Sequence, residues 1–334
     1  MNELLGRNKL VDPFNRNITY LRLSVTDRCD LRCTYCMPEK MTFLNKKEVL
    51  SFEEMHKLCS GFIQLGIKKI RITGGEPLVR KGIMDFFEML NSHLSPHLEE
   101  LTLTTNGTQL HKYASQLYAN GVRRINVSLD TLDPQKFKNI TRIGSLQDVL
   151  LGIEAAKDAN LKIKINCVAL KNINDDEIDE FINWCVKKDF DLTFIETMPM
   201  GDIGNESRLN HFLSVNELKK SIFQKFQLED ISFSSGGPAK YCMIKGSDIK
   251  LGFITPLSHN FCSSCNRIRI DATGVLHQCL GQSNSLDLVL QVLDYQEAVS
   301  SSHVHLKGQI HFERGEIYGA LGLSLIHISE PTRP

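Results

Sequence analysis

Three cysteines stand in one short run, Cys29-Asp-Leu-Arg-Cys33-Thr-Tyr-Cys36, directly after the apolar, strand-like stretch Leu21 to Val25. Thiolates are soft ligands that select iron–sulfur clusters and zinc. Three thiols so close together, with no fourth nearby, can hold three corners of an iron–sulfur cluster and leave one iron open to another ligand. The run therefore predicts a reactive metal centre on a loop that follows a strand.

A structural zinc site is the alternative for this run. Zinc in such a site takes four protein ligands, and His56 and Cys59 lie downstream on an expected helix. The run nevertheless lacks the paired Cys-x2-Cys halves of a zinc ribbon, and it connects a strand to a helix. These features favour iron and sulfide over zinc.

A second group of thiols lies near the other end of the chain, at Cys262, Cys265 and Cys279. Cys242 could complete a zinc site with them, so their spacing alone supports a cluster and a zinc ion about equally. The sequence Asn-Arg-Ile-Arg follows Cys265 directly. On a strand its two arginines share one face, and two guanidiniums beside a metal would bind an anion or a planar base. The alternative is a solvated strand face.

Composition places the chain among ordinary globular proteins. It has 334 residues, 42% hydrophobic and 23% charged, which suits one large domain or a domain with an appended subdomain. Its formal net charge is zero, so the protein as a whole has no positive electrostatic field that would attract a nucleic acid. Any phosphate site must therefore be a local cluster of cations. The sequence shows no apolar span for a membrane and no signal peptide, which predicts a cytoplasmic protein. Ten cysteines in that compartment indicate metal or redox chemistry.

Strand-like and helix-like runs alternate over the first two hundred residues. This order predicts an α/β fold with a parallel sheet, an incomplete (β/α)6 TIM-type barrel, although a doubly wound sheet fits the same pattern. The expected strands are Tyr20–Val25, Lys69–Thr73, Glu100–Thr104, Arg124–Ser128, Lys162–Val168 and Leu192–Glu196. The expected helices are Phe52–Leu65, Gly82–His93, Gln109–Ala119, Ser145–Asn160 and Asp176–Lys188.

Local signals refine these elements. Ser51 followed by Glu54 is typical of a capping box, and Asp175 is the expected cap of the last helix. Polar or glycine-rich stretches follow the strands, and in barrel enzymes the chemistry lies at that end of the strands. Taken alone, Asn106-Gly107 is typical of an ordinary turn.

The pattern changes after about residue 200. A helix is expected at Leu213–Phe226, followed by short strands at Tyr241–Lys245, Lys250–Thr255, Arg267–Asp271 and Val275–Cys279. We therefore predict a barrel domain at 1–225 and a β-rich subdomain at 226–322. The end of the chain, 323–334, continues no readable pattern, and we expect it to be a non-native or disordered tail.

The x3-then-x2 cysteine spacing and Gly74-Gly75-Glu76-Pro77 together resemble the radical S-adenosylmethionine (SAM) superfamily. Over about Leu5 to Gly322 the chain resembles one family within it, the GTP 3′,8-cyclases, lyases of molybdenum cofactor biosynthesis. The stretches that carry this resemblance are Leu21-Arg22-Leu-Ser-Val-Thr-Asp-Arg-Cys29, Lys69-Ile-Arg71-Ile-Thr-Gly-Gly-Glu-Pro-Leu78, Thr104-Thr-Asn-Gly107, Ile125-Asn-Val-Ser-Leu-Asp130, Phe194-Ile-Glu-Thr-Met-Pro199 and Phe261-Cys-Ser-Ser-Cys-Asn-Arg-Ile-Arg269.

The resemblance implies two 4Fe–4S clusters and a bound SAM. Cys29, Cys33 and Cys36 would hold the first cluster, whose open iron SAM chelates, and Cys262, Cys265 and Cys279 would hold the second, whose open iron binds guanine. The residues implied around SAM are Tyr35, Gly74, Gly75, Glu76, Ser128 and Met198. Those implied around GTP are Arg22, Lys69, Arg71, Thr104, Lys164, Arg267, Ile268 and Arg269, with Arg71, Arg267 and Arg269 in catalytic roles.

The implied reaction converts GTP to (8S)-3′,8-cyclo-7,8-dihydro-GTP. An electron donor reduces the first cluster, SAM is cleaved, the deoxyadenosyl radical takes the ribose 3′ hydrogen, and the sugar carbon attacks C8 of guanine. The family also implies functional coupling to the cyclic pyranopterin monophosphate synthase, and the chain could form a homodimer. Another radical SAM enzyme with an auxiliary cluster, such as a peptide maturase, and a zinc-binding interaction module are the alternative functions.

Two departures from the family pattern affect these expectations. Thr193 stands where some members have an arginine, so one phosphate contact is absent or comes from elsewhere. The family ends in a free Gly-Gly that reaches the active site, whereas this sequence ends Leu323-Ser-Leu-Ile-His-Ile-Ser-Glu-Pro-Thr-Arg-Pro334. We therefore expect this polypeptide to generate the radical but to turn over GTP poorly.

Overall fold

The computed structural model describes residues 10–12, 15–197, 211–256, 265–277 and 285–288. The predictions for Met198, Cys262, Cys279 and the C-terminal tail lie outside these residues. The chain divides into two compact units, which are described separately. The first comprises Met1–Asp27, Leu44–Leu101 and Asn266–Pro334, and the second comprises Arg28–Phe43 and Thr102–Cys265.

The first unit is built on three parallel strands in the order β10-β1-β2, and two short antiparallel strands extend the β10 edge. Helices α1 and α2 pack together, and the rings of Phe52 and Phe86 stack with centroids 5.2 Å apart. The elements are β1 (Tyr20–Ser24), α1 (Phe52–Gln64), β2 (Lys69–Thr73), η2 (Pro77–Val79), α2 (Ile83–Asn91), β10 (Arg267–Ile270), β11 (Val275–His277) and β12 (Ser285–Asp287).

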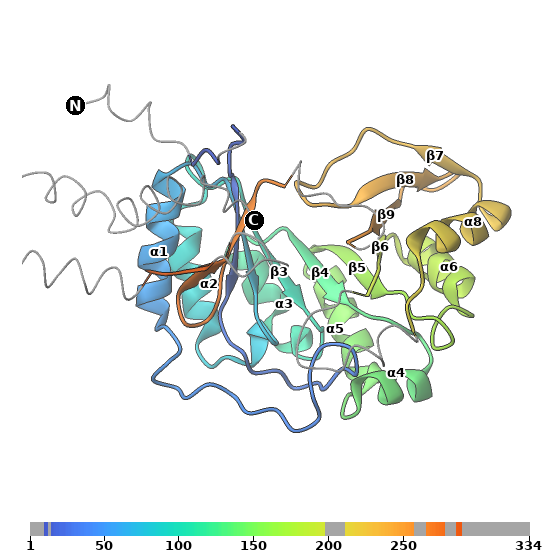
Figure 1. Cartoon of the computed structure of the whole chain (residues 1–334), viewed down its shortest axis with the longest axis horizontal. Helices are drawn as coiled ribbons and strands as arrows, with labels where there is room; N and C mark the ends of the chain where they lie inside the picture. The colour runs from blue at the N-terminus through green and yellow to red at the C-terminus, as the bar shows by residue number, and fades with distance from the viewer. Residues whose placement is uncertain (1–9, 13–14, 198–210, 257–264, 278–284, 289–334) are drawn as a thin grey trace, which may run out of the picture. The chain divides into compact units, whose positions relative to one another are not determined.

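The second unit has the strand order β3-β4-β5-β6-β9-β8-β7, parallel from β3 to β9 and antiparallel at its β7 edge (Figure 1). Its strands are β3 (Glu100–Thr105), whose first two residues belong to the first unit, β4 (Arg124–Ser128), β5 (Lys162–Val168), β6 (Asp191–Ile195), β7 (Leu228–Asp230), β8 (Lys240–Ile244) and β9 (Lys250–Ile254). Its helices are α3 (Leu110–Ala119), α4 (Pro134–Thr141), α5 (Leu146–Asp158), α6 (Ile178–Lys188) and α8 (Val215–Lys225).

Side chains alternate along the parallel strands of both units. One face is apolar and fully buried, as at Leu21 and Ile70 in the first unit and Ile125 and Ile165 in the second. The opposite face carries arginine, lysine, asparagine and threonine. Parallel strands are usually apolar on both faces because both are covered, so a polar face on such strands indicates a surface that meets a ligand.

All six expected parallel strands and all five helices of the first two hundred residues are present, with ends shifted by at most a few residues. The Ser51–Glu54 capping box is confirmed. Helix α4 was missed because its apolar face is short. Asp133 is its N-cap, and Pro134 is its first residue. The Asp175 cap is wrong: α6 starts at Ile178.

The missed start of α6 has a tertiary cause. Glu177 occupies the cap position without a side-chain cap bond, because its carboxylate accepts the Thr131 hydroxyl at 2.6 Å and the Leu132 amide at 3.3 Å. Strands β7 and β12, each of three residues, were also missed. The boundaries 1–225, 226–322 and 323–334 stay a prediction. The described strands after residue 225 join both units, β7 to β9 the second and β10 to β12 the first.

No helix within the described residues is long and apolar enough to cross a membrane.

A histidine pair in the first unit predicts an acid-sensitive fold. The Nε2 atoms of His56 and His93 lie 3.0 Å apart, within hydrogen-bond distance. Burial, and then His56 and His97, lower the pKa of His93. A depressed histidine pKa gives stability that is complete above the unfolded value, about 6.5, and that is lost as the pH falls below it.

We expect acidification from about pH 7.5 to pH 5.5 to lower the Tm of the wild type more than that of His93→Gln. Thermal unfolding followed by circular dichroism measures the difference. Equal shifts in the two proteins would show that the pair does not contribute.

Candidate functional site

The cysteine loop, residues 28–43, belongs to the second unit and brings its thiols together. Cys29 and Cys33 are partly buried and Cys36 is exposed. The pKa of the Cys33 thiol is raised well above its usual value, first by a hydrogen bond with the Cys36 side chain and then by burial, with Cys29 close enough to add to the effect. Three thiolates held so close repel one another, so this donor set suits a cation such as the iron of a cluster.

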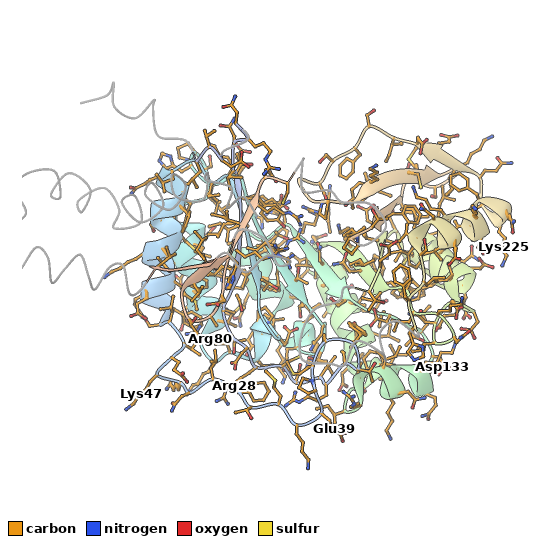
Figure 2. All side chains as sticks on the ribbon, in the orientation of Figure 1. Arg28, Glu39, Lys47, Arg80, Asp133 and Lys225 are labelled. Atoms are coloured by element: carbon orange, nitrogen blue, oxygen red, sulfur yellow. The ribbon has the colours of Figure 1, made fainter. Side chains whose placement is uncertain are left out.

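Hydrogen bonds connect the cysteine loop to the end of α4. The amides of Arg32 and Thr34 donate to the carbonyls of Thr141 and Ile140 at 3.0 and 2.9 Å. Arg142, the residue that ends α4, donates from its guanidinium to the Arg32 carbonyl at 2.8 Å. Arg28 and Glu39 mark the loop in Figure 2. These bonds hold the cysteine backbone in place through main-chain groups.

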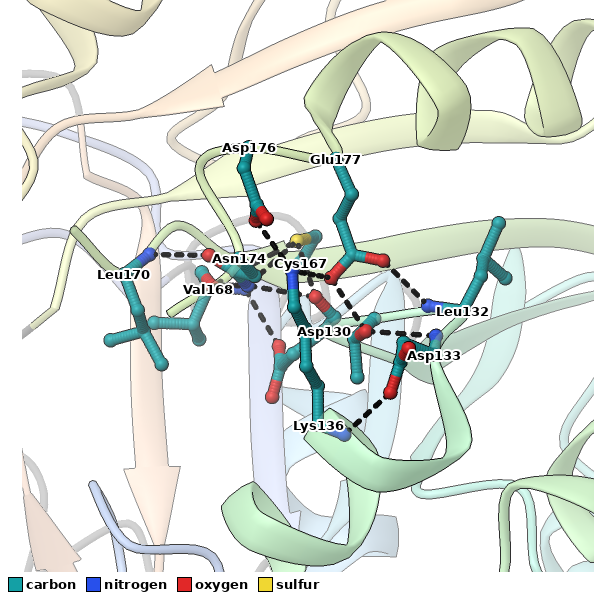
Figure 3. Close-up of polar contacts among 11 residues, drawn as sticks. Asp130, Leu132, Asp133, Lys136, Cys167, Val168, Leu170, Asn174, Asp176 and Glu177 are labelled. Atoms are coloured by element: carbon teal, nitrogen blue, oxygen red, sulfur yellow. Dashed lines mark hydrogen bonds and ion pairs between the residues drawn. The ribbon is translucent and has the colours of Figure 1, made fainter. Parts of the chain in front are cut away.

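Tyr35, between two of the cysteines, anchors the loop to the end of β4. Its hydroxyl donates to Asp130 Oδ2 at 2.6 Å, and the other carboxylate oxygen accepts the Val168 amide at 2.8 Å. The Asn174 amide donates to the carbonyls of Asp130 and Val168 at 2.7 and 2.9 Å, which joins the ends of β4 and β5 (Figure 3). Burial raises the pKa of Asp130 to about 6, and burial also raises that of Tyr35.

Removing the Asp130 carboxylate should loosen this network. We expect Asp130→Ala to lower the free energy of unfolding by about 2–4 kcal/mol, because two buried donors lose their acceptor. Since the pKa of Asp130 is raised on folding, the wild type should also lose stability as the pH rises from about 4 to 6, and the variant should lose less. Urea unfolding at several pH values measures both effects.

Tyr35→Phe serves as the comparison for this prediction. If Tyr35 acts through Asp130, the double variant should be less destabilised than the sum of the two single variants. Additive losses would contradict the anchor.

Two rows of cations lie side by side on the polar face of the first unit. Arg22 is the register partner of Arg71 on one side and of Arg269 on the other. Two residues earlier along each strand, on the same face, Tyr20 is the partner of Lys69 and Arg267. Like charges on neighbouring strands destabilise a sheet, so this arrangement indicates a site for a polyanion.

The electrostatics of the two rows support this interpretation. Burial, followed by the charges of Arg269 and Arg71, lowers the pKa of Arg22 to about 9. The Nε atom of Arg22 is buried and has no hydrogen-bond partner among the described residues. Lys69, by contrast, is paired with Glu100 at 2.6 Å and lies 4.9 Å from the centre of the Tyr20 ring. The row of Arg22, Arg71 and Arg269 carries three positive charges, whereas Tyr20 separates the two cations of the other row, so the row of three arginines is the stronger anion site.

The turn after β2 explains its glycines. Gly74 has φ +150°, and a Cβ there would lie 2.5 Å from the Thr26 carbonyl oxygen, which also accepts the Gly75 amide at 2.8 Å. Glu76 is fully buried and its carboxylate accepts the Leu78 amide at 3.0 Å. Only glycine permits this close approach of backbone to backbone.

The polar face of the second unit contains buried oxygens that lack a partner. Within the described part of the chain, the side-chain oxygens of Thr104, Asn126 and Asn166 are buried without a hydrogen bond. Lys164, also buried, donates to the Tyr241 hydroxyl at 3.0 Å. Burying an oxygen without a hydrogen bond costs free energy, so the polar face of these strands is suited to a ligand that supplies hydrogen-bond donors.

The structure thus places the predicted residues in two sets. The first unit brings together Arg22, Lys69, Arg71, Gly74, Gly75, Glu76, Arg267, Ile268 and Arg269. The second contains Cys29, Cys33, Tyr35, Cys36, Thr104, Ser128, Lys164 and Cys265. Ile268 is buried on the apolar face of its strand, so a ligand on the polar face would meet only its backbone.

Several site residues were missed by the sequence analysis. Asp130 and Asn106 stood in the quoted strand-end motifs, but only the fold shows that they contact the cysteine loop. Asn174 and Glu177 gave no sequence signal. Cys59, Cys167, Cys185 and Cys242 are buried thiols of the core.

A cavity of about 520 Å³ opens beside Tyr35 in the second unit. Its size is in the range of small-molecule sites. Thr34 and Tyr35 from the cysteine loop, Asn139 and Arg142 from the α4 region, and Thr197 line part of it.

Comparison with known proteins identifies the family. Residues 23–185 match the Radical SAM superfamily, and residues 190–308 match Molybdenum Cofactor Synthesis C. GTP 3′,8-cyclase from Paracoccus denitrificans is 55% identical over 279 residues, which are 84% of this chain and 81% of that protein. The enzyme from Sinorhizobium medicae is 56% identical over 280 residues, 84% of this chain and 80% of its own length.

The chain belongs to the GTP 3′,8-cyclase family. A cyclase of this family is a radical SAM enzyme, so its chemistry uses SAM and an iron–sulfur cluster. The similarity to these relatives therefore argues against the two alternative functions, a zinc-binding module and a peptide maturase.

Solved structures confirm the fold. Streptococcus suis SuiB bound to S-adenosylmethionine matches with a TM-score of 0.62 and 14% identity, over 82% of this chain and 64% of that one. Its complex with precursor peptide SuiA matches with a TM-score of 0.57. At this identity the likeness shows the architecture alone. The sheet of this chain is of the open, radical SAM type, with additional C-terminal strands.

Proposed function

We propose that this chain cyclises GTP to (8S)-3′,8-cyclo-7,8-dihydro-GTP in a SAM-dependent radical reaction, the first step of molybdenum cofactor biosynthesis. The observation that carries the proposal is the convergence of three thiols on one strand-end loop, in a chain 55% identical to GTP 3′,8-cyclases. The likeness in sequence supports the substrate, and the donor set supports the chemistry.

We assign the first cluster to Cys29, Cys33 and Cys36. When bound, a cluster with an open iron supplies the electron that cleaves SAM to methionine and a deoxyadenosyl radical. The chain's own part is to hold the three sulfurs in position, through the bonds of the loop to α4 and through the Tyr35–Asp130 bond. We keep Tyr35, Ser128 and the turn at Gly74–Glu76 as SAM residues, together with Met198. The cavity beside Tyr35 has a size that suits the adenosine part of SAM.

We assign the triphosphate of GTP to the row Arg22, Arg71 and Arg269. Three guanidiniums on neighbouring strands neutralise phosphate charge with bidentate hydrogen bonds, and the bound anion in turn relieves their mutual repulsion. Orienting the nucleotide in this way converts a bimolecular encounter into a positioned reaction. The remaining GTP residues stay predictions: Lys69, Thr104, Lys164, Arg267 and Ile268, as do the catalytic roles of Arg71, Arg267 and Arg269.

Further parts of the proposal stay predictions. They are a second 4Fe–4S cluster at Cys262, Cys265 and Cys279, an external electron donor, coupling to the cyclic pyranopterin monophosphate synthase, a homodimer and a cytoplasmic location.

The test is a reaction under strictly anaerobic conditions. Protein reconstituted with iron and sulfide is mixed with SAM, a reductant and GTP carrying deuterium at the ribose 3′ position, and products are followed by mass spectrometry. We expect deuterium to appear in 5′-deoxyadenosine, together with a cyclised nucleotide. ATP in place of GTP is the control. The assignment of the substrate would be contradicted if deoxyadenosine formed equally with ATP and with GTP, and if the deoxyadenosine formed with the deuterated GTP carried no deuterium.

A further inference from the structure

The turn after β3, residues 105–108, is fixed by packing. The Gly107 amide donates to Thr105 Oγ1 at 3.1 Å, and Gly107 has φ +87°. A Cβ on Gly107 would lie 3.0 Å from Val149, and a Cβ on Gly152 of α5 would meet the Gly107 carbonyl oxygen at 2.2 Å. Strand, turn and helix approach so closely that the position of Asn106 is set by the backbone around it.

The orientation of the Asn106 amide is also determined. Its Oδ1 accepts the backbone amide of Thr108 at 3.0 Å, and a backbone amide can only donate. Its Nδ2 lies 2.7 Å from Asp30 Oδ1, and a carboxylate can only accept. The opposite orientation would place two acceptors against each other on one side and two donors on the other. The NH₂ group therefore faces the cysteine loop.

Asn106 meets the loop beside its first cysteine. Nδ2 lies 3.8 Å from Cys29 Sγ, and the Leu31 amide donates to the same sulfur at 3.4 Å. Asp30, the next residue along, is held by three side chains, because Thr108 Oγ1 and Gln109 Nε2 also donate to it, at 2.6 and 3.2 Å. The sulfur of Cys29 thus faces two N–H groups, one from the main chain and one that a substitution can remove.

We infer that Asn106 is a positioning residue that raises the reduction potential of the cluster held by Cys29, Cys33 and Cys36. This inference rests on the proposed function. Reduction adds negative charge that is shared by the thiolate sulfurs, so an N–H dipole aimed at one of them stabilises the reduced state more than the oxidised state. At 3.8 Å the amide acts chiefly as an oriented dipole in a partly buried site, where such dipoles are weakly screened.

The experiment compares reduction potentials in reconstituted protein. Redox titrations followed by electron paramagnetic resonance are made on wild type, Asn106→Ala and Asn106→Asp, using the signal that SAM perturbs, and iron is counted in each protein. Gln109→Ala is the matched control, because it removes one donor to Asp30 and leaves the sulfur contact unchanged. We expect a more negative potential in Asn106→Ala, a larger shift in Asn106→Asp, where a carboxylate faces the sulfur, and no shift in Gln109→Ala.

Three results would overturn the inference. They are an unchanged potential in Asn106→Ala, an equal shift in Gln109→Ala, and loss of the cluster from both Asn106 variants while Gln109→Ala retains it, since the role of Asn106 would then be structural only. Failure of the proposed function looks different, because wild-type protein itself would then give no SAM-sensitive signal and no cyclised nucleotide.

Discussion

Cys33→Ala is expected to abolish SAM cleavage completely. Cys33 lies in the middle of the cysteine loop, and its thiol is hydrogen-bonded to the Cys36 side chain. With only two thiols left, the iron–sulfur cluster loses one of its three protein ligands. The radical chemistry belongs to the cofactor, so losing the cluster removes the reaction instead of slowing it.

Iron analysis and a 5′-deoxyadenosine assay measure this effect. We expect about four fewer irons per chain and deoxyadenosine at background level. Cys185→Ala is the control: this thiol is fully buried in α6, so its loss should cost about 1–2 kcal/mol of stability through a small cavity and leave the iron content unchanged. Wild-type deoxyadenosine formation by Cys33→Ala would show that the cluster is held elsewhere.

Arg22→Met is expected to stabilise the fold and to weaken GTP binding. Arg22 lies between Arg71 and Arg269, and burial and these two charges lower its pKa to about 9. A methionine of similar length removes the repulsion and the desolvation cost, so the free energy of unfolding without GTP should rise by about 1–2 kcal/mol. Removing the central guanidinium should weaken GTP binding by about 2 kcal/mol or more, roughly 30-fold.

The pH dependence gives this prediction a second readout. A base whose pKa is lowered on folding destabilises the protein while it is charged, and the fold regains stability as the pH rises through the lowered value. The advantage of Arg22→Met should therefore shrink above about pH 9. Denaturant unfolding across this range measures the change, and calorimetric titration measures GTP affinity.

Arg80→Met is the matched control in the same unit. Arg80, labelled in Figure 2, donates to the Leu50 carbonyl at 2.6 Å and lies 4.0 Å from the centre of the Phe52 ring, so its guanidinium has favourable partners. Its loss should lower stability by about 2 kcal/mol and leave GTP affinity unchanged. If Arg22→Met also destabilised the protein, the row of arginines would not be a strained anion site.

The sequence predicted the elements of the barrel well, because their signals are local. The alternation in Lys69–Thr73 and the capping box at Ser51 need no information from distant residues. Where a tertiary contact changed a local preference, prediction failed, as at Asp175, since Glu177 binds Thr131 instead of leaving the start of α6 to its own cap. The short edge strands β7 and β12 were also missed.

By itself, the sequence determined which chemistry this protein carries: cysteine spacing, glycines that permit a close turn, and arginines two apart on a strand. These features are fixed by residue type and short spacing, which folding does not alter. Only the tertiary structure decided how that chemistry is supported, because the bonds from Asp130 to Tyr35 and from Asn106 to Asp30 join residues 95 and 76 positions apart. The register of β10, β1 and β2 likewise decides that three arginines stand in one row, since strand pairing depends on the whole sheet.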